Sequence, residues 1–286
     1  MKQSQQTDSL CPIGDCYTKA MDATEFQDLI WQKGRALYRD MPWRDDTRPY
    51  YVLVSELMLQ QTQVDRVIPK FQAFIATFPD VTALATASLA DVLKAWQGLG
   101  YNRRAKYLHQ AAQRVTTDFK GVFPSTKQAL MSLPGVGPNT AGAILNYAFN
   151  QPTIFIETNV RTVYFQHFFS DGSKVTDSEL LPLIAHTLDR EHPGQFYWAL
   201  MDYGSWLKKN GANRIAQSTH YKKQTPLKGS IREVRGQIMK QLATRDVRLA
   251  ELEQQFAGDV RFKPALEGLI QDGMISLTGE TAHLTR

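Results

Sequence analysis

Cysteine is nearly absent from this chain, whose 286 residues contain only Cys11 and Cys16. Two cysteines cannot form a disulfide framework, and they cannot supply the four thiolates of a closed metal site. The six histidines are scattered and show no H-E-x-x-H pair or other zinc spacing. We therefore expect catalysis, if there is any, to need no metal.

Long hydrophobic runs are also missing. No stretch approaches the roughly 18 apolar residues that a membrane span requires, and no hydrophobic segment follows Lys2 that could act as a secretory signal. The sequence thus predicts a cytoplasmic protein without a membrane partner. Its 43% hydrophobic and 21% charged residues fit a globular protein of about two domains, which we expect to be a monomer.

Positive charge is concentrated in one segment, although the net charge is only +5. Between Trp206 and Lys240, nine lysines and arginines accompany a single acid, Glu233. Such a run is typical of a surface that follows a phosphate backbone, but a solvated linker has the same composition. Residues 241–286 carry five basic and seven acidic side chains, so this segment could equally bind protein or read bases.

The spacing of apolar residues divides the chain into a leader at 1–22, a helical domain at 23–225, a linker at 226–230 and a small domain at 231–286. Strand-like alternation is almost absent before residue 270, so the fold class is mainly α. The first helix should begin near Glu25 and end near Met41. Further helices are predicted over 50–61, 63–77, 88–95, 103–117, 126–132, 139–149 and 159–168.

The C-terminal domain has a pattern of its own. Three helical patterns start at Ile231, Leu249 and Phe262, and two short strands flank the turn at 278–280. Three helices followed by a hairpin is the order of a winged helix. We therefore predict a small winged-helix-like domain after the helical one.

A glycine-rich turn joins two helical patterns in LPGVGPNTAGAIL at 133–145, within a predicted hairpin at 126–149. Glycines permit the turn and let backbone N–H groups at the start of the second helix face a phosphate, aided by a monovalent cation at 134–138. A compact helix corner has the same pattern. The candidate DNA-contacting residues of this turn are Gly135, Val136, Gly137, Asn139 and Thr140.

Two acids interrupt apolar stretches, where a charge is costly unless it is used. Glu157 lies in FIETNVR at 155–161, and Glu56 lies in VSELMLQQT at 54–62. Each could instead form a structural ion pair or cap a helix. Their positions nevertheless make both acids candidates for catalysis.

Several motifs in order resemble the helix-hairpin-helix DNA glycosylases, and within them the adenine-specific mismatch glycosylases of the MutY type. The similarity spans about residues 41–203. It implies a two-lobed helical fold with a cleft that receives a nucleotide flipped out of duplex DNA. The motifs are MPWR at 41–44, SELMLQQTQV at 55–64, WQGLGYNRRAKYL at 96–108, LPGVGPNTAGAIL at 133–145 and ETNVRTV at 157–163.

Flipping requires a wedge that fills the vacated stack, and the resemblance places Gln60 at the position of the family's intercalating glutamine. Asn102 stands where the family motif GLGYY has its second tyrosine, and an amide cannot stack as that ring would. The resemblance further implies DNA contacts from Gln61, Tyr101 and Arg103.

The two acids match the chemistry that the resemblance implies. Cleavage of a purine N-glycosidic bond needs a proton for the base and a negative charge near the cationic sugar. By resemblance, Glu56 is the acid that protonates adenine N7, Glu157 takes the place of the family's aspartate, and Asn159 orients these groups. Glu157 is longer than aspartate by one methylene, which would displace the carboxylate unless the backbone compensates.

The resemblance implies a monofunctional enzyme of base excision repair, because Asn139 replaces the lysine with which bifunctional relatives attack the sugar. The expected substrate is double-stranded DNA with a mismatch or an oxidised base, and the expected target is adenine opposite 8-oxoguanine or guanine. A thymine or uracil mismatch glycosylase and a non-enzymatic DNA-binding protein remain as alternatives. The protein would then be nucleoid-associated.

Two family features are missing from this chain. Relatives usually close the helical domain with four cysteines around an iron–sulfur cluster, where this chain has a basic run that includes Lys208 and Lys209. The expected cofactor is therefore none, with lysines supplying the DNA contacts of the cluster loop. The winged-helix-like domain also replaces the family's domain for reading 8-oxoguanine, so preference for that base does not follow automatically.

Overall fold

The computed structural model describes residues 21–286, so that Cys11, Cys16 and most of the predicted leader lie outside the described residues. The described chain forms two compact units. The smaller one, here the small unit, comprises residues 21–38, 156–189 and 196–221, and the large unit comprises residues 39–155, 190–195 and 222–286. Within the described residues, no helix has both the length and the apolar character to cross a membrane.

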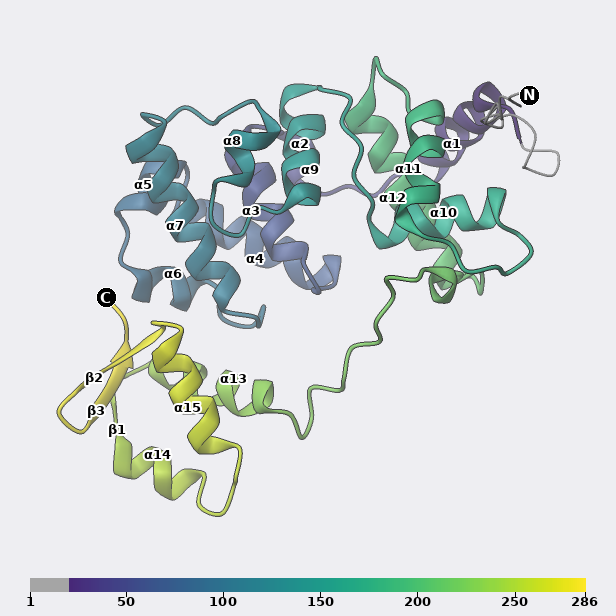
Figure 1. The fold of residues 1–286 in the computed structure, drawn as a ribbon. Helices are drawn as coiled ribbons and strands as arrows, with labels where there is room; N and C mark the ends of the chain where they lie inside the picture. Colours follow the sequence, from purple (N-terminus) through teal and green to yellow (C-terminus); the bar gives the residue numbers. More distant parts are fainter. Residues whose placement is uncertain (1–20) are drawn as a thin grey trace, which may run out of the picture. The chain divides into compact units, whose positions relative to one another are not determined.

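The small unit is built from four helices and a 3₁₀ turn (Figure 1). Helix α1 begins after Asp22 because this residue and Glu25 form a reciprocal capping box. Phe26 of α1 is fully buried, and its ring lies 5.1 Å from that of Tyr164 and 5.0 Å from that of Phe168. The elements are α1 (Ala23–Leu37), α10 (Thr158–Phe168), α11 (Asp177–Thr187), all but the first three residues of α12 (Pro193–Lys209) and η1 (Ile215–Gln217).

The large unit is centred on α3 (Pro49–Leu59), which begins with a proline at a position where no backbone N–H is needed. Seven of its 11 residues are buried, and it packs against α4, α7 and α9. A helix that is apolar on most sides fits the middle of a bundle. The other helices before residue 155 are α2 (Pro42–Asp45), α4 (Val64–Thr77), α5 (Val81–Thr86), α6 (Leu89–Ala95), α7 (Arg103–Asp118), α8 (Lys127–Met131) and α9 (Pro138–Phe149).

The C-terminal segment of the large unit has three helices and a three-stranded antiparallel sheet with the order β1-β3-β2. The hairpin turns at Gly279, whose φ of +57° favours glycine, and pairs Ile275 with Leu284. The sequence predicts the three helices and the hairpin, but not the strand β1, among these elements. The elements are α13 (Ile231–Leu242), β1 (Val247–Arg248), α14 (Leu249–Gln255), α15 (Phe262–Gln271), β2 (Ile275–Thr278) and β3 (Thr281–Leu284).

The core of the C-terminal segment is continuous with that of the preceding helices, because buried residues of both form one cluster. Polar contacts reinforce the packing against α6 and α7. The carboxylate of Asp272 accepts hydrogen bonds from Arg103 at 2.6 Å and from Arg235, and its backbone carbonyl accepts from Lys106. The side chain of Gln97 donates to the carbonyl of Met239 at 3.1 Å.

The mainly helical fold class is confirmed, since the described residues before 222 contain helices and one isolated β-bridge, Val175–Ser218. The first helix ends at Leu37, earlier than predicted, because the chain is extended at Met41 and a separate helix starts at Pro42. Three other helices were not predicted. α5 is only six residues long, α11 contains Pro182, and α12 has no clear polar face in its sequence.

The Asp272 contact gives a prediction about stability. Partial burial by itself would raise the pKa of Asp272, but hydrogen bonds from Arg103 and Arg235 outweigh it and hold the pKa below its ordinary value. Asp272→Asn should therefore lower the free energy of unfolding by about 1–3 kcal/mol at neutral pH. The difference from wild type should shrink as the pH falls through the lowered pKa, below about pH 4.

Urea titrations of both proteins at pH 7 and pH 3 measure this difference. Asp246→Asn is the matched control, because Asp246 is exposed in the same segment. Equal stability of Asp272→Asn and wild type at pH 7 would contradict the prediction.

Candidate active site

The glycine-rich turn joins α8 to α9, so the helical hairpin predicted at 126–149 is present. Gly135 has a φ of +78°, and a Cβ there would lie 2.8 Å from the Cβ of Tyr107, so both the backbone and the packing require glycine. Gly137 and Asn139 are exposed, whereas Val136 and Thr140 are buried. The side chains of Val136 and Thr140 therefore offer little surface for the proposed contacts, and the backbone N–H of Val136 donates to the carbonyl of Leu133.

Glu56 lies on the central helix α3 of the large unit. Its neighbours Ser55 and Leu57 are each 1% exposed, whereas Glu56 itself is only half-buried. The apolar helix therefore fixes the backbone of Glu56 firmly, while the residue itself remains partly accessible. This is the environment that a proton donor to a bound base requires.

The expected wedge residues line one pocket of about 960 Å³ in the large unit. Gln60 ends α3, and Gln61 follows it with a φ of +57°. Tyr101, which precedes α7, has a φ of +48°. Left-handed backbone is uncommon for residues with side chains, and it persists where surrounding contacts enforce it. The structure thus brings Gln60, Gln61, Tyr101, Asn102 and Arg103 together in one pocket.

The contacts that enforce this geometry come from Arg104, which is 7% exposed. Its guanidinium lies 5.4 Å from the ring of Trp96 and donates hydrogen bonds of 2.6–3.4 Å to the end of α3 and to the loop before α7. Burial lowers the pKa of Arg104 to about 10, so the group keeps its charge at neutral pH. The acceptors are the carbonyl oxygens of Leu57, Met58, Gln60, Leu99, Gly100 and Tyr101 and the hydroxyl of Thr62.

Glu157 and Asn159 lie at the start of α10 in the small unit, where Glu157 is the residue before the first helical one. Burial raises the pKa of the Glu157 carboxyl, while the charge of Arg161 and the backbone N–H of Thr158 act in the opposite direction. The partial positive charge at a helix N-terminus also favours the carboxylate. Burial therefore opposes the expected ionised state of Glu157. The charge of Arg161, the N–H of Thr158 and the start of the helix favour that state.

Asn159 is held in place by α12. A Cβ on Gly204 would lie 2.4 Å from the carbonyl oxygen of Asn159, so only glycine lets the two helices approach this closely. The amide nitrogen of Asn159 contacts the sulfur of Met201 at 3.7 Å. Its Oδ1 atom is buried without a hydrogen-bond partner among the described residues, which leaves one acceptor available to a ligand.

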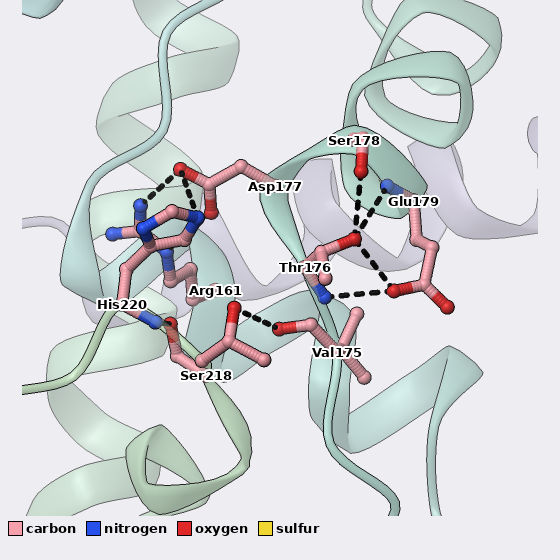
Figure 2. A network of polar contacts seen from close by, with 9 residues as sticks. Arg161, Val175, Thr176, Asp177, Ser178, Glu179, Ser218 and His220 are labelled. Atoms are coloured by element: carbon pink, nitrogen blue, oxygen red, sulfur yellow. Dashed lines mark hydrogen bonds and ion pairs between the residues drawn. The ribbon is translucent and has the colours of Figure 1, made fainter.

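The chain after α12 is attached to α10 and α11 by polar contacts (Figure 2). Arg161 forms a bidentate pair with Asp177 at 2.7 and 3.0 Å, and His220 lies 4.0 Å from the same carboxylate. Residues 175 and 217–219 add backbone hydrogen bonds. Gln217 donates from its side chain to the carbonyl oxygens of two residues before α11. The segment is therefore ordered by hydrogen bonds.

Lys208 and Lys209 occupy the last turn of α12 in the small unit. The side chain of Lys209 is exposed, and that of Lys208 is half-buried. The basic run as a whole is less available than its sequence indicates, because Arg214 bonds to Gln166 and Arg235 pairs with Asp272. Of the predicted site residues, Glu157, Asn159, Lys208 and Lys209 belong to the small unit and the others to the large unit.

Two residues of this site escaped the sequence reasoning. Arg104 follows another arginine at the start of a helix, and nothing in that pattern tells which of the two is buried. Gly204 stands inside an apolar helix, where an isolated glycine is a weak sign of close packing.

The fold of this chain is similar to that of known DNA glycosylases and related enzymes of solved structure. Two solved structures have the same fold. A thermostable thymine-DNA glycosylase has a TM-score of 0.57 at 23% identity and covers 64% of this chain and 86% of its own. An endonuclease III–DNA covalent intermediate has a TM-score of 0.55 at 16% identity, with coverages of 72% and 91%. At these identities the similarity shows the fold alone.

Sequence similarity is more specific. Residues 54–184 match the HhH-GPD superfamily base excision DNA repair protein model. An adenine DNA glycosylase of Mycobacterium tuberculosis (strain CDC 1551 / Oshkosh) is 33% identical over 84% of this chain and 87% of its own. The adenine DNA glycosylase of Homo sapiens is 38% identical over 58% of this chain and 33% of its own. The chain belongs to the HhH-GPD superfamily of base excision DNA repair proteins.

The contacts of Arg104 give a prediction about the wedge loops. Lysine carries the same charge but cannot place several donors in the plane of a guanidinium. Arg104→Lys should therefore lower the free energy of unfolding by about 2–4 kcal/mol, because buried carbonyl oxygens lose their donors. Arg103→Lys is the matched control, since the exposed Arg103 makes a surface pair worth about 1 kcal/mol or less. Equal losses in urea titrations of the two variants would contradict the role of Arg104.

Proposed function

We propose that this chain is an adenine DNA glycosylase of base excision repair. It hydrolyses the N-glycosidic bond of a flipped, mispaired adenine opposite 8-oxoguanine or guanine in duplex DNA. The observation that carries the proposal is the presence of Glu56, Asn159 and, in place of the family's aspartate, Glu157 in a superfamily member whose relatives over most of the chain are adenine DNA glycosylases.

In this reaction Glu56 donates a proton to N7 of the adenine, which makes the base a better leaving group. The half-buried position of Glu56 on a rigid helix supports this role. The glycosidic bond then breaks, and the electron pair of that bond leaves with the base. A water molecule adds to the sugar and completes the hydrolysis.

Glu157 stabilises the positive charge that develops on the sugar as the bond breaks. Its carboxylate must be ionised for this purpose, and Arg161 and the start of α10 favour that state against the effect of burial. The free Oδ1 acceptor of Asn159 orients the sugar or the attacking water.

The enzyme is monofunctional and leaves an abasic site. Asn139 is exposed at the start of α9, where a bifunctional relative would carry lysine, and an amide cannot form a Schiff base. The backbone N–H groups of the turn before α9 hold a phosphate of double-stranded DNA, and Lys208 and Lys209 add further phosphate contacts. We further propose that the enzyme acts as a monomer at the nucleoid, in the cytoplasm.

A base-release assay tests the proposed function. Labelled duplexes with A·8-oxoG, A·G, T·G and U·G pairs are incubated with the protein, and released bases are separated and counted. Adenine release from the first two duplexes is the expected result. Release of thymine or uracil instead would support the other mismatch specificity. Binding to duplex DNA without release of any base would identify a non-enzymatic DNA-binding protein.

Amide substitutions separate the two carboxylates, because they remove proton donation and negative charge with little change in shape. Glu56→Gln should bind mismatched DNA but lose excision by about 10²–10⁴-fold. Glu157→Gln should also bind and lose excision by about 10²–10³-fold. Single-turnover rates with adenine and with an analogue that departs more easily distinguish the roles, since the analogue should recover more rate in Glu56→Gln.

The pH dependence provides a further check on Glu157. Because burial raises its pKa, the rate should begin to fall at a higher pH than the pKa of about 4.3 of an exposed glutamate would give. Glu157→Gln should lack this acid limb. Glu253→Gln, exposed on α14, is the matched control and should retain the wild-type profile. Full activity of Glu157→Gln would transfer the role to another acid, such as the buried Asp202.

We also propose that the enzyme works without an iron–sulfur cluster. Four cysteines are needed, and the chain has only two. The segment after α12 replaces the cluster loop. Hydrogen bonds attach it to the residues between α10 and α11. The purified protein should therefore be colourless and should keep its excision rate after chelation of transition metals. Iron at one cluster per chain would contradict this prediction.

A further inference from the structure

The pocket at the wedge loops has a wall that comes from outside the glycosylase motifs. Helix α13 contributes Arg232, Arg235 and Lys240, and the connector before it contributes Gln224 and Thr225. These residues follow the last motif that resembles the family. The C-terminal segment therefore takes part in the pocket that holds the expected wedge.

Two guanidinium groups lie near the ring of Tyr101. The carbon that joins the three guanidinium nitrogens of Arg104 is 5.5 Å from the ring centroid, and that of Arg232 is 5.6 Å from it. Arg232 also donates a hydrogen bond to the phenol oxygen of Tyr101. Cations at this distance from an aromatic ring are attracted to its face, which restricts the ring as well as the backbone.

Arg232 is itself oriented by the connector. Its second terminal nitrogen donates to the carbonyl of Thr225 at 2.6 Å and to that of Pro226 at 3.3 Å. The neighbouring Gln224 bonds to the side chain of Gln61 at 3.1 Å. The connector thus contacts Gln61 directly and Tyr101 only through Arg232, and these are the two non-glycine residues of left-handed backbone in the pocket.

We propose that Arg232 is a positioning residue for the wedge, a role that rests on the proposed function. We take the Tyr101 ring, next to Asn102, as the aromatic part of this wedge, and Arg232 fixes the ring before it enters the base stack beside the flipped nucleotide. Asn102 offers no second ring, so a single aromatic side chain has to fill this space. A ring that is already ordered loses less conformational entropy on insertion, and this makes a single ring sufficient.

The proposal separates Arg232 from the other cations of the pocket. A lysine or arginine that only neutralises phosphate raises affinity for all duplexes and steepens the salt dependence. An arginine that orders the wedge affects mismatched DNA, where the wedge is inserted, more than matched DNA. Lysine can neutralise phosphate as arginine does, but it cannot make the planar contact that orders the wedge ring.

The test uses the full-length protein and a duplex with a non-cleavable adenine analogue opposite 8-oxoguanine. A 2-aminopurine next to the 8-oxoguanine reports unstacking through its fluorescence. Arg232→Ala should reduce the fluorescence increase and weaken mismatch binding by about three- to tenfold, with little effect on matched DNA. Arg232→Lys should resemble Arg232→Ala. In a Tyr101→Ala background, Arg232→Ala should have no further effect on the fluorescence.

The matched control is Arg248→Ala, because Arg248 is exposed in the same C-terminal segment and does not line the pocket. Thermal denaturation of each variant verifies its folding. Three results would overturn the proposal: full rescue by lysine, an equal loss of affinity for matched and mismatched DNA, or a larger fluorescence increase in Arg232→Ala. If the wild-type protein inserts its wedge but releases no adenine from a cleavable duplex, the proposed function fails while the role of Arg232 stands.

Discussion

The arrangement of the large unit's pocket depends on the hydrogen bonds that the guanidinium of Arg104 donates. Two chain segments, the end of α3 and the loop before α7, leave their carbonyl oxygens without helical partners, and one buried cation satisfies them together. The left-handed backbone of Gln61 and Tyr101 is maintained next to these bonds. The same helix α3 also carries Glu56, so the proposed proton donor and Gln60 share one rigid support.

The start of α10 in the small unit follows a different principle, which is close packing. Gly204 lets α12 contact the backbone of Asn159, and this approach buries the polar atoms of the helix start. Burial strengthens electrostatic interactions because water no longer screens them. It also raises the pKa of Glu157, so Arg161 is needed nearby, and Asp177 orients that arginine. Arg161 thus acts directly on the Glu157 carboxyl, and Asp177 acts on it through Arg161.

The C-terminal segment extends the large unit and does not form a separate core. Its core is continuous with that of the helices, and Asp272 binds Arg103 and Arg235 across the contact. The exposed Arg103 therefore forms an ion pair with Asp272 and also lines the pocket. The C-terminal segment thus supplies one wall of the pocket that Gln60 and Tyr101 also line.

The sequence by itself determined the helical class, the glycine-rich hairpin, the two acids and the terminal β-hairpin, because periodicity, turn residues and a charge within an apolar run are local signals. Tertiary structure decided the rest. Arg103 and Arg104 are adjacent and chemically identical, yet only the packing of α3 and α7 buries the second one. Arg232 lies 131 residues from Tyr101 in the chain, and two-residue β1 exists only through its pairing with β3. Contacts between distant segments leave no periodic pattern in a single sequence, so only the folded chain reveals them.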